Sequence, residues 1–534
     1  MALAIYRKPF LTGRIVLITL LTIISLPIFS LLSYWFRETS SYLEYFKENL
    51  VLEYLTNTLI LILGTSFTCL ILGIFTAWIV VKHDFPGKKY FEIAFIIPLA
   101  IPVYIQAYTY AGLFDYGGVF QTTLSYFSIR HIDIMNIWGL IFVYSSVLFP
   151  YVYLMVRSSF LLQSNRIEKA GFTLSKNKWT TLSRLIIPLS WPAIFGAITL
   201  VVIEVLNDYG AVKYFGVNTF VVGIFRSWFG MGDIGAAMYQ SFLLILIVGG
   251  VLLIETIANR KKKYHSKQGE PIAKNPVKFG SKTTIVVLIL CSLIVLFSLL
   301  LPMGQQLYWA SINSELFSDS SYLSALLNSL GVALCIASLV AIIAFIAVFL
   351  MTIIKKKSYK TLLKFSLLTY FLPGAILAIS VIIFVTQIDS LFNIQIISST
   401  TIFGGSTIVL CFAYFIRFYG VAHNSLATIN DKLPNTYLNT AFSLGKNVGG
   451  VFLKIYSALM RPAFFSTFLL VFIDVIKELP LMLILRPFNF DTLATMAYQS
   501  ANDELTDQSS VYALTILLLS IVPTVYLIRS TKNN

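Results

Sequence analysis

The chain has 534 residues, of which 57% are hydrophobic and only 12% are charged. A soluble domain carries roughly 25% charged residues and cannot bury so much apolar surface, so this composition excludes a soluble globular protein and indicates a bilayer as the solvent. The net charge of +15 does not indicate nucleic-acid binding, because the lysines and arginines lie in short loops between apolar runs.

Apolar runs near the roughly 20 residues that a membrane helix needs recur along the whole chain. The first six lie near residues 15–35, 57–81, 91–112, 137–161, 191–208 and 239–258. The second six lie near 283–303, 325–353, 362–386, 402–420, 461–480 and 511–529. The first run follows basic residues as in a signal peptide, but no small-residue cleavage site comes after it, so we expect an uncleaved helix. The sequence thus predicts an all-α polytopic membrane protein of about twelve transmembrane helices.

The charges of the loops predict the orientation. The loop Arg157–Arg184 carries six basic residues and one acid, whereas the loop Pro487–Ser510 carries four acids and no base. By the positive-inside rule the first faces the cytoplasm and the second faces outside. Both termini are therefore expected on the cytoplasmic side of a bacterial inner membrane. The spans are expected to contact lipid.

Acidic pairs inside two apolar runs indicate an internal duplication. Glu204 and Asp474 are 270 residues apart, as are Asp208 and Glu478, and Pro192 and Pro462 repeat at the same distance. Because six spans is an even number, the two copies are expected to be parallel repeats. The expected segments are an N-terminal helix and outer loop (1–56), a first repeat (57–258), a cytoplasmic linker (259–282), a helix and outer loop (283–324) and a second repeat (325–530).

A long cytoplasmic segment precedes the fifth span of each half. The first reads KAGFTLSKNKWTTLSRLIIPLSWPAI (Lys169–Ile194), and the second reads NTAFSLGKNVGGVFLKIYSALMRPAFF (Asn439–Phe465). This pattern resembles the EAA loop of ABC importer permeases, which implies docking on an ATPase subunit. The residues to which the resemblance assigns coupling are Lys169, Ala170, Gly171, Ser175, Thr440, Ala441 and Gly445. An ordinary amphipathic connector is the alternative, and Lys169, Ser175 and Ala458 depart from the Glu, Gly and Pro usual in the family.

Three further stretches resemble the ferric-iron ABC importer permeases with fused halves. They are PLAIPVYIQAYTYAGLFDYGG (Pro98–Gly118), FGVNTFVVGIFRSWFGMGDIGAA (Phe215–Ala237) and IDVIKELPLMLILRPFNFDTLAT (Ile473–Thr495). The resemblance implies a type I importer fold, two ATP-binding cassette subunits and an extracytoplasmic iron-binding protein as partners. No GxxxxGK[ST] loop occurs in the sequence, so ATP and Mg²⁺ are expected on the partner subunits, and this chain is expected to bind no cofactor and to be no enzyme.

The intramembrane acids are candidates for a translocation path. A charge at the bilayer centre costs roughly 2.5–3.5 kcal/mol on the mildest scale, and acids four apart share one helix face, so they are expected to face the interior. Hard cations such as Fe³⁺ prefer oxygen ligands. The candidates are Glu204, Asp208, Tyr209, Asp474 and Glu478, and a ring of negative potential is one arrangement they would allow. The alternative is a structural role, such as a hydrogen bond to a neighbouring helix.

Other readings of the sequence stay open at this point. Paired intramembrane acids also suit an ion-coupled secondary transporter, and fused permeases for thiamine or phosphonate share the architecture. Arg417 and Arg486 are expected to be interhelical or docking residues. The four histidines and four cysteines show no ligand spacing, so no fixed metal site is predicted.

Overall fold

The computed structural model describes residues 7–34, 40–128, 132–162, 184, 186–260, 277–278, 280–354, 358–392, 406–434 and 436–533. The chain divides into two compact units. Unit 1 comprises Met1–Ser40, Glu315–Met496 and Leu518–Asn534, and unit 2 comprises Ser41–Ser314 and Ala497–Leu517. Each unit therefore combines segments that are distant in the sequence.

In its described residues, unit 2 is helical apart from one short strand pair. Its helices up to the linker are α3 (Ser41–Tyr45), η1 (Phe46–Leu50), α4 (Val51–Lys82), α5 (Lys88–Ala94), η2 (Ile97–Ala100), α6 (Val103–Phe114), α7 (Val119–Tyr126), α8 (Ile137–Leu162), α11 (Ile187–Leu189), α12 (Trp191–Asn207), α13 (Gly210–Tyr214), α14 (Phe220–Phe225), η4 (Arg226–Gly230) and α15 (Ile234–Arg260). They are followed by α16 (Ser281–Val295), η5 (Leu296–Leu300) and α17 (Leu301–Ile312). The parallel pair is β1 (His83–Asp84) with β2 (Val277–Lys278).

The centre of unit 2 is formed by α4, α8 and α12, which pack against one another. A small residue allows the close approach of two of them, because a Cβ added at Gly73 would lie 2.5 Å from the Cβ of Val152. Helix α6 packs against α8, α13 and α17. The end of α12 therefore lies in the same interior region of unit 2 as side chains of α6 and α8.

Unit 1 is also helical in its described residues. Its elements are α2 (Arg7–Tyr34), α18 (Ser320–Ile353), α19 (Ser358–Leu368), η7 (Thr369–Phe371), α20 (Gly374–Phe392), α21 (Thr407–Asn430), α22 (Thr436–Ser443), α23 (Val448–Val451), η8 (Phe452–Tyr456), α24 (Ser457–Lys477) and α25 (Pro480–Leu485). Three further elements contain residues of both units: η6 (Ser314–Ser318), α26 (Leu493–Asn502) and α27 (Thr506–Asn533).

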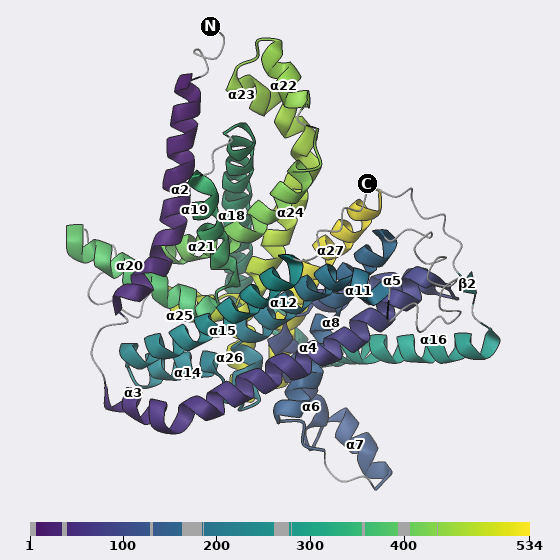
Figure 1. Cartoon of the computed structure of the whole chain (residues 1–534). Helices are drawn as coiled ribbons and strands as arrows, with labels where there is room; N and C mark the ends of the chain where they lie inside the picture. Colours follow the sequence, from purple (N-terminus) through teal and green to yellow (C-terminus); the bar gives the residue numbers. More distant parts are fainter. Residues whose placement is uncertain are drawn as a thin grey trace. The chain divides into compact units, whose positions relative to one another are not determined.

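Helices α18, α21 and α24 pack side by side at the centre of unit 1, as Figure 1 shows in green. Aromatic side chains fill the contact of α18 with η8, where the ring centroids of Phe349 and Tyr456 are 4.9 Å apart. Helix α2 packs on α19 and α20. Its Ser30 hydroxyl donates a 3.0 Å hydrogen bond to the carbonyl of Ser380 in α20.

About twelve membrane spans are present, as the apolar runs predict. Nine helices in the described part of the chain are long and apolar enough to cross a bilayer, and a pair of helices bent by 97° brings the number to ten if the pair counts as one span. Helix α12, of 17 residues, is a shorter apolar helix in the position of the fifth predicted run. Helix α21 supplies the tenth run and contains Arg417 and His423, which lower its hydropathy.

The helix is interrupted within the third apolar run of each half, a feature that the runs 91–112 and 362–386 do not reveal. In unit 2 the chain is extended at Ile101 (φ −85°, ψ 122°) before Pro102, and in unit 1 it is extended at Leu372 (φ −79°, ψ 134°) before Pro373. A residue that precedes proline is forced out of the helical region by the proline ring. Within the run 362–386, α19 and η7 end at this break, and α20, which is long and apolar enough to cross a bilayer, begins at Gly374.

Candidate functional site

The duplicated acids occupy equivalent local positions in the two units. The burial patterns of residues 201–210 and 471–480 are identical: Glu204 and Asp474 are partly exposed, while Asp208 and Glu478 are buried. Asp208 and Glu478 both follow the last helical turn, with extended backbones. Each carboxylate accepts a 3.2 Å hydrogen bond from the backbone N–H three residues later, at the start of α13 or α25. Both acids therefore cap the short helix that follows them.

In unit 1 the buried acid is neutralised by an arginine. Nη2 of Arg417 lies 3.1 Å from Oε2 of Glu478, and the two side chains are only 7% and 6% exposed. Nη1 of Arg417 donates a 3.2 Å hydrogen bond to the carbonyl of Leu372, at the break before Pro373. One arginine thus joins α21, the break between η7 and α20, and the end of α24.

Gly374 provides the space for this ion pair. A Cβ at this position would lie 2.7 Å from Oε1 of Glu478 and 3.1 Å from Nη1 of Arg417. Any side chain here would displace one of the two charged groups. The other arginine that the sequence singles out, Arg486, forms a local ion pair with Asp491. Arg417 is therefore an interhelical residue.

In unit 2 no described lysine or arginine forms a salt bridge with the equivalent acid. Oδ1 of Asp208 accepts the capping hydrogen bond from the backbone N–H of Ala211, and Oδ2 has no hydrogen-bond partner among the described residues. Glu204 lies one turn earlier and accepts a 2.9 Å hydrogen bond from the hydroxyl of Tyr151. Glu204 and Asp208 interact electrostatically. The structure thus brings these two candidates together in unit 2.

Tyr108 and Tyr144 interact with Asp208, and four more tyrosines are linked to Tyr108 or to one another. We call these residues the tyrosine cluster: Tyr104, Tyr108, Tyr144, Asp208, Tyr209, Tyr214 and Tyr498. Asp208, Tyr104, Tyr214 and Tyr498 all act electrostatically on Tyr108, whose ring lies 4.6 Å from that of Tyr214. The hydroxyl of Tyr498 donates a 3.5 Å hydrogen bond to that of Tyr209. The cluster thus contains tyrosines of α6, α8, α13 and α26, and those of α6 and α8 interact with the carboxylate of Asp208.

Of this cluster, only Asp208 and Tyr209 are site candidates from the sequence. Tyrosines near the ends of apolar runs are usually interfacial anchors. For this reason the sequence does not single out Tyr104, Tyr108 and Tyr144, which are buried in the structure. The available signal is the four-residue spacing of Tyr104 and Tyr108, which places both on one face of a helix that follows a proline.

The two candidate coupling segments differ in what the structure describes. Lys169, Ala170, Gly171 and Ser175 lie outside the described residues. In the second half, α22 ends in a Schellman motif: the N–H of Lys446 bonds to the carbonyl of Ala441 at 3.2 Å, and the N–H of Gly445 to that of Phe442 at 3.0 Å. Gly445 has φ +79°, a left-handed conformation that glycine adopts without steric cost.

Helix α22 presents an apolar exposed face. Tyr437 and Leu444 are 53% and 77% exposed, and Thr440, which lies between them on the same face, is also exposed. Ala441 is 3% exposed and packs within the chain itself. The surface available to a partner is therefore the face of Tyr437, Thr440 and Leu444, adjacent to the predicted residue Ala441.

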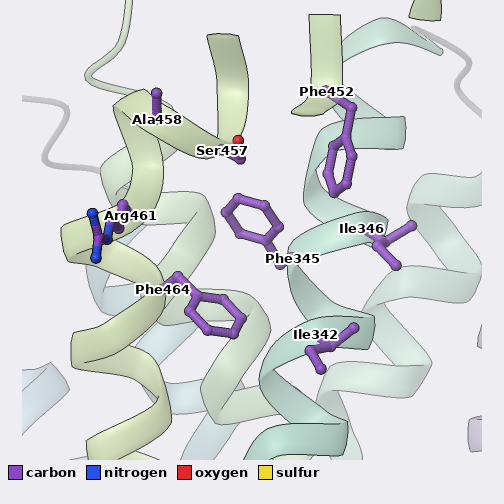
Figure 2. A pocket seen from close by; sticks show the side chains of 8 residues that line it. All are labelled: Ile342, Phe345, Ile346, Phe452, Ser457, Ala458, Arg461 and Phe464. Atoms are coloured by element: carbon purple, nitrogen blue, oxygen red, sulfur yellow. The ribbon is translucent and has the colours of Figure 1, made fainter. Parts of the chain in front are cut away.

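A separate groove lies on unit 1 between α18 and the segment of η8 and α24, with a volume of about 440 Å³ (Figure 2). Its polar lining residues are Ser457 and Arg461, and its other lining residues are apolar. Figure 2 shows the rings of Phe345, Phe452 and Phe464 along this groove. Such a lining offers an ion no set of oxygen ligands, so the groove is not suited to a translocation path.

Comparisons with known proteins agree with this architecture. The chain is 26% identical over 469 residues to the Fe(3+)-transport system permease protein FbpB 2 of Haemophilus influenzae, a match that covers 86% of this chain and 85% of that protein. It is 25% identical over 199 residues to a probable sulfate transport system permease protein of Marchantia polymorpha, covering 36% and 68%. It is 25% identical over 147 residues to the sulfate transport system permease protein CysT of Escherichia coli, covering 27% and 52%.

The family model places the chain among transport subunits. Residues 69–263 match the family described as binding-protein-dependent transport system inner membrane component. Members of this family are permeases and not enzymes, and separate ATPase subunits hydrolyse ATP, which sets aside an ion-coupled secondary transporter. Together with the multiple apolar helices, these matches support a multi-pass membrane protein that acts as a permease of an ABC importer.

Proposed function

We propose that this chain is the fused permease through which an ABC importer moves iron(III) across the inner membrane. The observation that carries the choice of substrate is the match to the Fe(3+)-transport permease, because it extends over both halves of the chain. The sulfate permeases match much shorter parts of the chain. The oxygen-rich interior around Asp208 also favours a hard cation over an oxyanion.

The proposed complex contains two ATP-binding cassette subunits, which bind ATP and Mg²⁺, and an extracytoplasmic protein that delivers iron. In this chain, one ATPase docks on the segment around Gly171 and the other on α22, whose exposed face consists of Tyr437, Thr440 and Leu444. Exposed apolar side chains on a short helix suit a groove on a partner. Both termini and the linker 259–282 lie in the cytoplasm in this proposal, as the charges of the loops predict.

The substrate is tested by reconstitution of the permease with its ATPase subunits and binding protein in proteoliposomes. ATP-dependent accumulation of labelled Fe³⁺, with no accumulation of labelled sulfate, is the expected result. Sulfate uptake without iron uptake would overturn the proposal.

The docking surface is tested by Leu444→Asp, which places a charge on the exposed apolar face of α22. The ATPase should then co-purify poorly while the amount of folded permease is unchanged, because Leu444 has few neighbours to lose. Phe488→Asp is the matched control: Phe488 is 88% exposed and lies in the loop expected outside. Equal ATPase binding by both variants would exclude α22 as the docking helix.

A further inference from the structure

The carboxylate of Asp208 has one engaged oxygen and one oxygen without a hydrogen bond. Oδ1 accepts from the N–H of Ala211 at 3.2 Å, and Oδ2 is buried with no partner in the described part of the chain. Asp208 is 9% exposed and forms no salt bridge with any described lysine or arginine. A buried carboxylate oxygen without a partner is costly, so its retention calls for a functional explanation.

Two buried phenols face the same acid from other helices. Tyr144 of α8 and Tyr108 of α6 are 0% and 1% exposed, and neither hydroxyl has a hydrogen-bond partner among the described residues. Both interact electrostatically with Asp208, and Tyr144 is also near enough to the carboxylate to act on it as a hydrogen-bonding neighbour. Oxygen atoms from three segments thus lie near one another in the interior of unit 2, and no described cation compensates the carboxylate.

The equivalent place in unit 1 is already satisfied. Glu478 caps the next helix as Asp208 does, but Arg417 lies 3.1 Å from its second oxygen. Glu478 occupies the same position in its repeat as Asp208 does, but its negative charge is compensated by Arg417. Of the two duplicated buried acids, only Asp208 is therefore available to a cation.

The oxygen atoms define the class of ligand. Carboxylate oxygen is a hard donor, and tyrosine oxygen is an iron ligand in proteins. No group of three or more His, Cys, Asp or Glu residues suited to a metal occurs in the described ranges, so a soft or tightly held metal does not fit. One carboxylate with neutral phenols suits brief occupation by a hard trivalent cation, as transport requires.

We infer that Asp208, Tyr108 and Tyr144 form a transient binding site for a hard trivalent cation, present in the first half of the chain only. The inference rests on the proposed function, since it names the place where iron(III) would pause on its way through the permease. Glu478 is assigned to the structure of unit 1 instead.

The test uses Tb³⁺ as a hard trivalent probe, because excited tyrosine transfers energy to bound Tb³⁺ and makes it luminesce. The full complex is titrated with Tb³⁺ alone, and iron uptake is measured on the same preparations. Asp208→Asn retains the capping oxygen but removes the charge, so the affinity for Tb³⁺ should fall about tenfold or more. Tyr144→Phe should lower the sensitised luminescence, and both variants should slow iron uptake at an unchanged amount of folded protein.

Tyr153→Phe is the matched control, because Tyr153 is a fully buried tyrosine of α8 whose hydroxyl also has no described partner. It should leave Tb³⁺ luminescence unchanged. Undiminished Tb³⁺ binding in Asp208→Asn would overturn the site, and an equal loss in Glu478→Gln would overturn its restriction to one half. Failure of the wild-type complex to transport iron would instead contradict the proposed function, so the two failures are distinguishable.

Discussion

The ion pair of Arg417 with Glu478 should be the principal electrostatic contribution to the stability of unit 1. Arg417→Met replaces the guanidinium by an apolar side chain of similar length and leaves Glu478 buried without its cation. Removal of one partner of a buried pair costs about 3–5 kcal/mol, because the remaining charge has lost its compensation. The carbonyl of Leu372 also loses the 3.2 Å hydrogen bond that satisfies it at the helix break.

The magnitude is measured by reversible unfolding of the purified permease in mixed micelles with increasing SDS, and a double-mutant cycle isolates the pair. Arg417→Met/Glu478→Met removes both charges, so it should be markedly more stable than the sum of the single changes predicts. The double variant should still be less stable than the wild type by about 1 kcal/mol, because it lacks the carboxylate that caps α25. Arg461→Met is the control, since this exposed arginine of the groove in Figure 2 should contribute less than about 0.5 kcal/mol.

A loss of less than about 1 kcal/mol in the free energy of unfolding of Arg417→Met would refute this prediction. Additive effects of the two changes in the double variant would refute it as well. Either result would mean that water reaches the pair and screens it. The exposed fractions of 7% and 6% argue against such access.

Three other predictions follow from single positions and loops. Gly374→Ala should destabilise unit 1 by about 1–3 kcal/mol in the same SDS titration, because its Cβ would lie 2.7 Å from a carboxylate oxygen of the ion pair. Gly445→Ala should cost about 1–2 kcal/mol at its φ of +79°, whereas Gly445→Asn should cost less, and equal stabilities would contradict the left-handed cap. Single cysteines labelled by a membrane-impermeant reagent from outside should react in Pro487–Ser510 and be protected in Asn259–Lys282, and the reverse pattern would refute the orientation.

Much of the fold is determined by local sequence patterns. Apolar runs of membrane length predict the spans, since a bilayer has a fixed thickness and backbone groups must be paired within it. The breaks before Pro102 and Pro373 have an equally local cause, although run length alone misses them. The cap at Gly445 also follows from a local requirement for a left-handed residue.

The roles of the duplicated acids were decided by tertiary structure alone. Sequence places Asp208 and Glu478 at equivalent positions and gives them one chemistry, but it cannot say which helix packs against each of them. Packing of α21 brings Arg417 to Glu478 from 61 positions earlier in the sequence. Around Asp208 the neighbours are tyrosines of α6 and α8 instead. Charge compensation acts over a few ångströms in space, and periodicity along the chain carries no information about such neighbours.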